Sequence, residues 1–289
     1  MARWNSGAAA THSCIPPSNP MKHHPLLAVL PLFVACSVPQ HTASRVVTLE
    51  VPAAALRRLA CTTGNGHIRV VGSATATAVT VQADLSVRGR TPAEAEANLR
   101  LLDVRKNVTD DGLTLAGVAD GVPGNCSPMI AFTIGLPASL DVAATTHNGD
   151  VRLDGGTGAA TANPHNGNVV VAGANTSVRA ESHNGDVEWR GEGRSVALMT
   201  HNGDATAAFT GQGEVQAVVT THNGDVRLAF PGAVDASFAA TTANGSIRVA
   251  GVVADVKFSD DGERATGRLG KGGTGRVQAT THNGDVKVQ

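Results

Sequence analysis

The chain of 289 residues is poor in aromatic side chains: it has no Tyr, and aromatic residues make up 3% of the total. Its 23 basic and 24 acidic residues give a formal net charge of -1 at pH 7. This composition excludes a base-stacking nucleic-acid surface and a polybasic membrane patch, so we expect no nucleic-acid partner.

The first residues of the chain carry an export pattern. Residues 1–20 have the pattern of neither a signal nor a fold, which indicates a start codon placed too early or a disordered extension. Residues 21–35 have a short polar start and then an apolar run, Leu26 to Ala35, which is too short to span a bilayer. They are therefore predicted to be a signal peptide, followed by a linker over residues 36–44.

Small residues end this apolar run directly before Cys36. Phe33-Val34-Ala35-Cys36 resembles the lipobox of bacterial lipoproteins, in which the Cys becomes the lipidated first residue of the mature chain. The alternative is an ordinary secretory signal with an incidental Cys. Ser37, in place of Asp, resembles lipoproteins sorted to the outer membrane, so we expect an exported protein anchored there.

Residues 45–140 predict a capping part of a larger structure. Thr91 begins a helix, because it is an N-cap residue with Pro92 and Glu94 behind it, and the pattern continues through Leu102. Strands are predicted over 45–51, 78–87 and 129–136, and a hairpin over 104–118. Asn65-Gly66 lies between two short alternating segments and marks a first coil. A helix and hairpin at this end would cover the strand edge of a stack.

Residues 141–289 repeat one phrase. Alternating segments flank an Asn-Gly pair, at intervals of 18, 18, 18, 21, 21 and 39 residues, which predicts strand, corner and strand in each unit. We interpret the longest interval as two coils with a weakened corner near Asp261-Gly262. The predicted structural corners are Asn148-Gly149, Asn166-Gly167, Asn184-Gly185, Asn202-Gly203, Asn223-Gly224, Asn244-Gly245 and Asn283-Gly284.

This repeat predicts an all-β, single-chain parallel β-solenoid of 18–21-residue coils. Each coil can bury its apolar side only against its neighbours. Asn-Gly suits the corner because Gly accepts positive φ. The shared register from the first coil onward favours one elongated domain.

Histidines and aspartates recur beside these corners. Stacked coils would place each type in a column at strand spacing, where zinc or copper could bind between coils. The simpler interpretation is that both residue types hydrogen-bond the corner backbone. The residues in question are His147, His165, His183, His201, His222 and His282, and Asp150, Asp186, Asp204, Asp225 and Asp285.

Other chemistry finds little support in the sequence. The Gly-Gly-x-Gly-x-Asp half-turns of calcium-binding β-rolls are missing, so we expect no calcium site of that kind. No activated Ser constellation stands out, so we expect no enzyme. Cys61 and Cys126 form an even pair in an exported protein, which allows a disulfide. Against that bridge, Cys61 takes an inward position, where a free Cys behaves as a small hydrophobe.

The repeated Thr-x-Asn-Gly-Asp-Val phrase, together with Gly64-Asn65-Gly66-His67-Ile68-Arg69-Val70, resembles the bacterial DUF4097 family. Its members carry Ser/Thr-Asn-Gly-Asp-Ile/Val repeats and are described as candidate adhesins. The resemblance implies a β-solenoid exported to the cell envelope and does not imply a catalytic site. We expect a non-catalytic, adhesin-like or scaffold protein. Expected partners are the membrane, through the lipid anchor, and surface polysaccharide, peptidoglycan or another envelope protein. The alternative is an envelope metal-binding or stress-sensing lipoprotein that uses the His and Asp columns.

Overall fold

The computed structural model describes residues 41–156 and 158–289. The predicted extension, signal peptide and lipidation site at Cys36 therefore lie outside the described residues. The predicted linker ends earlier than expected, because strand β1 (His41–Pro52) begins at His41. No helix in the described part of the chain is long and apolar enough to cross a membrane.

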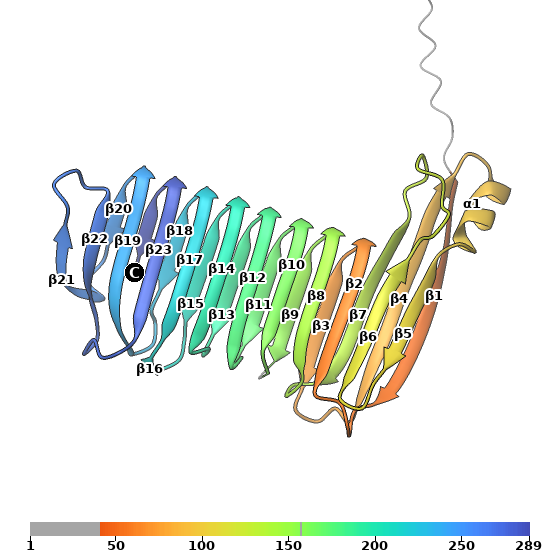
Figure 1. Cartoon of the computed structure of the whole chain (residues 1–289), viewed down its shortest axis with the longest axis horizontal. Coiled ribbons are helices and arrows are strands. Elements are labelled where there is room, and N and C mark those ends of the chain that lie inside the picture. The colour runs from red at the N-terminus through yellow and green to blue at the C-terminus, as the bar shows by residue number, and fades with distance from the viewer. Residues whose placement is uncertain (1–40, 157) are drawn as a thin grey trace, which may run out of the picture. The chain divides into compact units, whose positions relative to one another are not determined.

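The repeats form a parallel β-solenoid with two sheets, as the sequence predicts (Figure 1). Each coil places the strand before its corner in sheet B and the strand after it in sheet A. In the coils from Asp141 to Ala229, the sheet B strands are β8 (Asp141–Asn148), β10 (Ala160–Asn166), β12 (Ser177–Asn184), β14 (Ser195–Asn202) and β17 (Gln216–Asn223). The sheet A strands of the same coils are β9 (Val151–Gly156), β11 (Val169–Gly173), β13 (Val187–Gly191), β15 (Ala205–Phe209) and β18 (Val226–Ala229).

The register of the stack follows the repeat. From Asn148 to Asn223, parallel pairing aligns the residues three positions after each corner Asn, and these side chains are buried. The predicted inward column of sheet A is therefore confirmed: it consists of Val151, Val169, Val187, Ala205 and Val226. Most inward residues are small, but Trp189, Phe209 and Phe230 pack in series, with ring centroids 4.9 and 5.1 Å apart.

The first coil lies upstream, where Asn65-Gly66 predicts it. Strands β2 (Arg58–Asn65) and β3 (Ile68–Ser73) pair in parallel with β8 and β9, and Asn65 aligns with Asn148. The capping elements are β4 (Ala78–Gly89), helix α1 (Pro92–Leu99), β5 (Asp103–Val108), β6 (Gly112–Val118) and β7 (Met129–Pro137).

These capping elements end both sheets with antiparallel pairs. Strand β4 lies between β1 and β7 in sheet A, and β5 pairs with β6 at the end of sheet B. The Thr91 side chain accepts a hydrogen bond from Glu94 N, which confirms the N-cap, but the helix ends at Leu99 rather than Leu102. Helix α1 packs against β1 and β4. Strand β1 is the edge strand of sheet A.

The interpretation of the 39-residue interval as two coils is wrong. The remaining strands are β16 (Gly213–Glu214), β19 (Val234–Asn244), β20 (Ile247–Val249), β21 (Val253–Phe258), β22 (Arg264–Leu269), β23 (Arg276–Asn283) and β24 (Val286–Val288). Strands β21 and β22 form an antiparallel hairpin on β19, and no coil corner lies near Asp261-Gly262.

The last coil of the chain also lies inside the stack rather than at its end. Strand β23 pairs with β17 on one side and β19 on the other (Figure 1). Strand β24 lies between β18 and β20. The order of corners in space is therefore Asn223, Asn283, Asn244. The repeat register tolerates this order because every coil offers the same inward pattern to its neighbour.

Candidate binding groove

A groove of about 1000 Å³ runs along the outer face of sheet B, just before the corners. It crosses the stack from Thr62 on β2 to Thr241 on β19. Its floor repeats from coil to coil, because equivalent positions of each strand line it. The outward positions three before each Asn are Thr62, Thr145, Asn163, Glu181, Met199, Thr220, Thr280 and Thr241.

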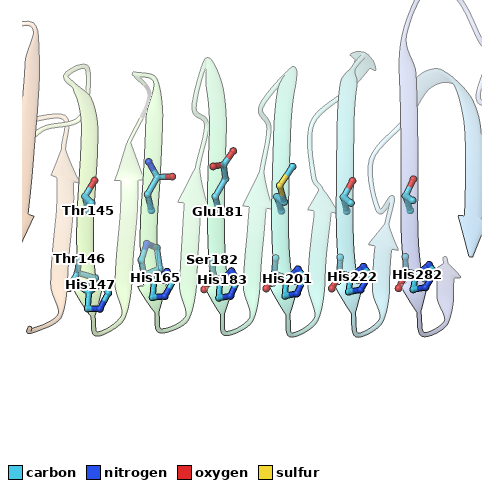
Figure 2. A pocket seen from close by; sticks show the side chains of 18 of the residues that line it. Thr145, Thr146, His147, His165, Glu181, Ser182, His183, His201, His222 and His282 are labelled. Atoms are coloured by element: carbon cyan, nitrogen blue, oxygen red, sulfur yellow. The ribbon is translucent and has the colours of Figure 1, made fainter. Parts of the chain in front are cut away.

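One wall of the groove is a row of imidazoles, the predicted histidine column. Figure 2 shows these rings in line on neighbouring strands, close to the corners. Adjacent ring centroids lie 4.8 to 4.9 Å apart, with interplanar angles of 2 to 6°. All six side chains are exposed: His147, His165, His183, His201, His222 and His282.

The asparagine beside each histidine fixes this spacing. Each corner Asn donates from Nδ2 to Oδ1 of the Asn on the neighbouring coil, over 2.6 to 2.9 Å. A second ladder lies just inside, where a Thr or Ser hydroxyl donates to the carbonyl of the neighbouring corner Gly; Thr200, for example, donates to Gly185 O over 2.7 Å. Pro164 occupies this position on β10 and has no hydroxyl to donate.

The corner glycines are required by the close approach of successive coils. Gly167 has φ +154°, and a Cβ atom there would lie 2.1 Å from Gly149 O. Real atoms do not approach so closely, so any larger residue would separate the coils. This strict corner stacking keeps the histidines in register.

The aspartate column lies on the other side of the corner and has a structural role. Asp204 Oδ1 accepts from Asp225 N at 2.8 Å, and Asp225 Oδ1 in turn accepts from Asp285 N at 2.9 Å. Asn168 takes one place in this column and accepts from Asp186 N in the same way, at 2.9 Å. These aspartates therefore hydrogen-bond the corner backbone, as the simpler interpretation of the sequence expects.

Hydrogen bonds and cations lower the pKa of two of these carboxyl groups. The backbone N–H and the hydroxyl of Ser246 hold the pKa of Asp285 below its ordinary value, with a further contribution from Arg248. Burial alone would raise the pKa of Asp204, but the hydrogen bonds from Asp225 N and Arg227 outweigh it, and the pKa falls.

Stacking places the imidazoles poorly for a shared metal ion. Parallel rings 4.8 to 4.9 Å apart direct their nitrogen lone pairs side by side, whereas Zn²⁺ needs ligands that converge at about 2.0–2.1 Å. Residues 41–156 and 158–289 contain no group of three or more His, Cys, Asp or Glu side chains arranged to hold a metal ion. The arrangement of the described residues thus gives no support to the zinc or copper site.

The outer face of sheet A differs from the groove in its charge. Arg152 pairs with Asp154 at 2.7 Å, and Arg227 pairs with Asp225 at 2.9 Å and also with Asp204. The groove, in contrast, is lined mainly by Thr and His and contains one carboxylate, Glu181, which pairs with Arg179 on the same strand.

The two described cysteines are free thiols, so this structure contains no Cys61–Cys126 bridge. Cys61 lies in an inward position of β2, where burial raises its pKa to about 12. Cys126 accepts a hydrogen bond from Asn98 Nδ2 of helix α1 at 3.1 Å. Both thiols are packing groups away from the groove.

The corners and the histidine column are predictable from the sequence, whereas the groove is seen only in the structure. The outward row of Thr, Asn, Glu and Met residues varies in chemistry, and only its fixed offset from Asn marks it. The signal was present in the alternation of the strands, because residues three before each Asn must point outward on the side of the histidines.

Comparison with known proteins gives one family and three similar folds. The family model described as Toastrack DUF4097 matches residues 37–289. A search of curated proteins finds no match. A candidate cell adhesion protein from Clostridium sporogenes is similar in structure at 11% identity and TM-score 0.40, covering 85% of this chain and 99% of that chain.

Two further solved structures are similar to this chain. A candidate adhesin from Bacteroides fragilis has 14% identity and TM-score 0.39, covering 85% of this chain and 97% of that chain. A candidate adhesin from Parabacteroides merdae has 11% identity and TM-score 0.30, covering 85% of this chain and 96% of that chain.

Proposed function

This chain belongs to the Toastrack DUF4097 family, and we propose that it is a non-catalytic, adhesin-like scaffold of the cell envelope whose groove holds an extended ligand. The observation that supports this proposal is the continuity of the groove from Thr62 to Thr241. A repeating polymer can contact the equivalent positions of successive coils, whereas a small molecule would use only a few of these positions.

The ligand classes that fit are surface polysaccharide, peptidoglycan or an extended segment of another envelope protein. Each offers many weak, similar contacts, which add up along a rigid surface. Thr hydroxyls and imidazole edges provide both donors and acceptors for such contacts. The ladders of the corner keep these groups in place before the ligand arrives, which lowers the ordering cost of binding.

A groove-blocking substitution tests this proposal. Thr220→Trp places a bulky side chain on the groove floor and should abolish co-sedimentation of the purified protein with insoluble peptidoglycan and with cell-wall polysaccharide. Thr206→Trp, on the outer face of sheet A, is the matched control and should bind like the unsubstituted protein. Equal binding by both variants, or no binding by the unsubstituted protein, would reject the groove as the ligand site.

Anchoring belongs to the same proposal and rests on the sequence Phe33-Val34-Ala35-Cys36. Lipidation at Cys36 would hold the solenoid at a membrane surface, with the outer membrane as the expected location. The variant Cys36→Ala should move from the membrane fraction to the soluble fraction when cells are fractionated. Unchanged partitioning of this variant would contradict a lipid anchor.

A further inference from the structure

We infer that the groove binds an acidic polysaccharide and that this binding strengthens as the medium becomes acidic. The inference rests on the proposed function. It adds the chemical class of the ligand and the dependence of binding on pH. Six imidazoles in one line along a groove are the observation from which it starts. Histidine is the side chain that ordinarily gains its charge between about pH 8 and 5.

The charge of the groove depends almost entirely on these histidines. Apart from them, the lining residues are Thr, Ser, Asn, Pro, Met and Ala, with Glu181 as the one carboxylate. Glu181 is paired with Arg179 on its own strand. The groove is therefore close to neutral when the imidazoles are neutral, and it becomes a line of positive charge when they are protonated.

Other charged groups near the row leave this conclusion unchanged. The aspartate column lies across the corner, where its Oδ1 atoms accept backbone hydrogen bonds. Arg227, Arg248 and Lys287 lie beside that column and pair with it. No ion pair between the described residues joins one of these carboxylates to an imidazole of the row.

The spacing of the row favours a polyanion over a single anion. Protonated rings 4.8 to 4.9 Å apart repel one another, so a ligand with evenly spaced negative charges stabilises the protonated row. By linkage, a ligand that prefers the protonated row must also raise proton uptake, and its affinity must rise as pH falls.

Ring orientation favours carboxylates over nucleobases. Stacking covers both faces of the inner imidazoles of the row, so a ligand reaches only the edges of these rings, where N–H groups can donate to carboxylate oxygens. No Trp, Tyr or Phe is among the described residues that line the groove. Single-stranded nucleic acid would lack the aromatic platforms on which its bases stack.

Binding of polygalacturonate, a polymer with one carboxylate per sugar, tests the inference. Its carboxylates are ionised at both about pH 5.5 and about pH 7.5, so any pH dependence comes from the protein. We expect the purified protein to bind it about ten-fold more tightly at the lower pH, at constant ionic strength. Neutral dextran should show no such change, and oligothymidylate should bind more weakly than polygalacturonate.

Substitutions at the row and beyond its ends sharpen this test. His165→Asn, His183→Asn and His201→Asn combined should weaken the pH dependence, because half of the row is then uncharged at both pH values. His67→Asn, outside the row, should leave the pH dependence intact. Gly64 and Ala243 occupy the equivalent positions on the two coils that flank the row. Gly64→His with Ala243→His should therefore extend the row and increase the pH dependence, and this variant removes no existing contact of the corner ladders.

Binding of polygalacturonate that is equal at both pH values, unchanged in the triple variant, or matched by oligothymidylate would overturn the inference. If pH-independent polymer binding is nevertheless lost in Thr220→Trp, the proposed function stands and only this inference fails. If the protein binds no polymer at either pH, both fail.

Discussion

Each residue of the Asn-Gly corner has a distinct role in the stack. Asn forms a side-chain ladder, Gly permits close approach, and the following Asp accepts a backbone N–H from the next coil. From the sequence, Gly is expected at the corner because a tight corner needs a positive φ. The structure shows a stronger requirement for Gly. A Cβ atom at Gly167 would lie only 2.1 Å from a backbone carbonyl oxygen of the neighbouring coil.

Gly167→Ala should therefore destabilise the protein by about 2 kcal/mol or more, because the new methyl group meets a backbone atom and the residue has φ +154°. Urea unfolding measures this change. Gly64→Ala is the control, since no atom lies within 4 Å of its Cβ position, and it should change stability by less than about 0.5 kcal/mol. Equal effects of the two substitutions would contradict the close-approach argument.

The aspartate column predicts a loss of stability in acid. The folded pKa of Asp285 lies below the value of about 3.9 expected in the unfolded chain. Its contribution is thus complete above that unfolded value and is lost as pH falls through the folded value. Asp285→Asn keeps an acceptor oxygen, as Asn168 does naturally, but does not titrate.

We therefore expect a smaller fall in Tm between about pH 5 and about pH 3 for Asp285→Asn than for the unsubstituted protein. Thermal unfolding followed by circular dichroism at the two pH values measures the difference. The same fall in both proteins would show that this carboxylate does not contribute to acid sensitivity.

Among the secondary-structure elements, the sequence predicts where the strands lie along the chain better than it predicts which strands pair with one another. The strand and hairpin positions of the capping part and the parallel coils are confirmed. The order of the last coils could not be predicted, because β17 offers nearly the same edge to β19 as to β23. Similarly, the helix pattern continues to Leu102, which is buried without being helical.

Cysteine cross-linking tests the position of β23. Thr220 and Thr280 are direct partners in neighbouring strands, so Thr220→Cys with Thr280→Cys should form a disulfide under mild oxidation. Thr220→Cys with Thr241→Cys should not, because β23 lies between and places the two strands about 9.6 Å apart. Mass spectrometry of the unreduced protein distinguishes the pairs. A disulfide joining positions 220 and 241 in the second variant would instead support coils stacked in sequence order.

At the scale of the solenoid as a whole, its two outer faces have different chemistry. Sheet A carries ion pairs beside the aspartate column, whereas sheet B carries a nearly uncharged groove and the histidine row. The sequence predicts both columns, because a repeat stacks equal positions. It does not predict a groove, because strand alternation shows which residues face outward but not how much space lies between them.

Histidine-ring NMR signals report directly on whether an extended ligand lies along this groove. Soluble peptidoglycan strands and, separately, polygalacturonate are added to the purified protein while the ring signals are recorded. We expect the signals of the row, such as those of His165, His183 and His201, to shift together while the His67 signal stays in place. Shifts confined to His67, or an unchanged row in the presence of a bound polymer, would contradict it.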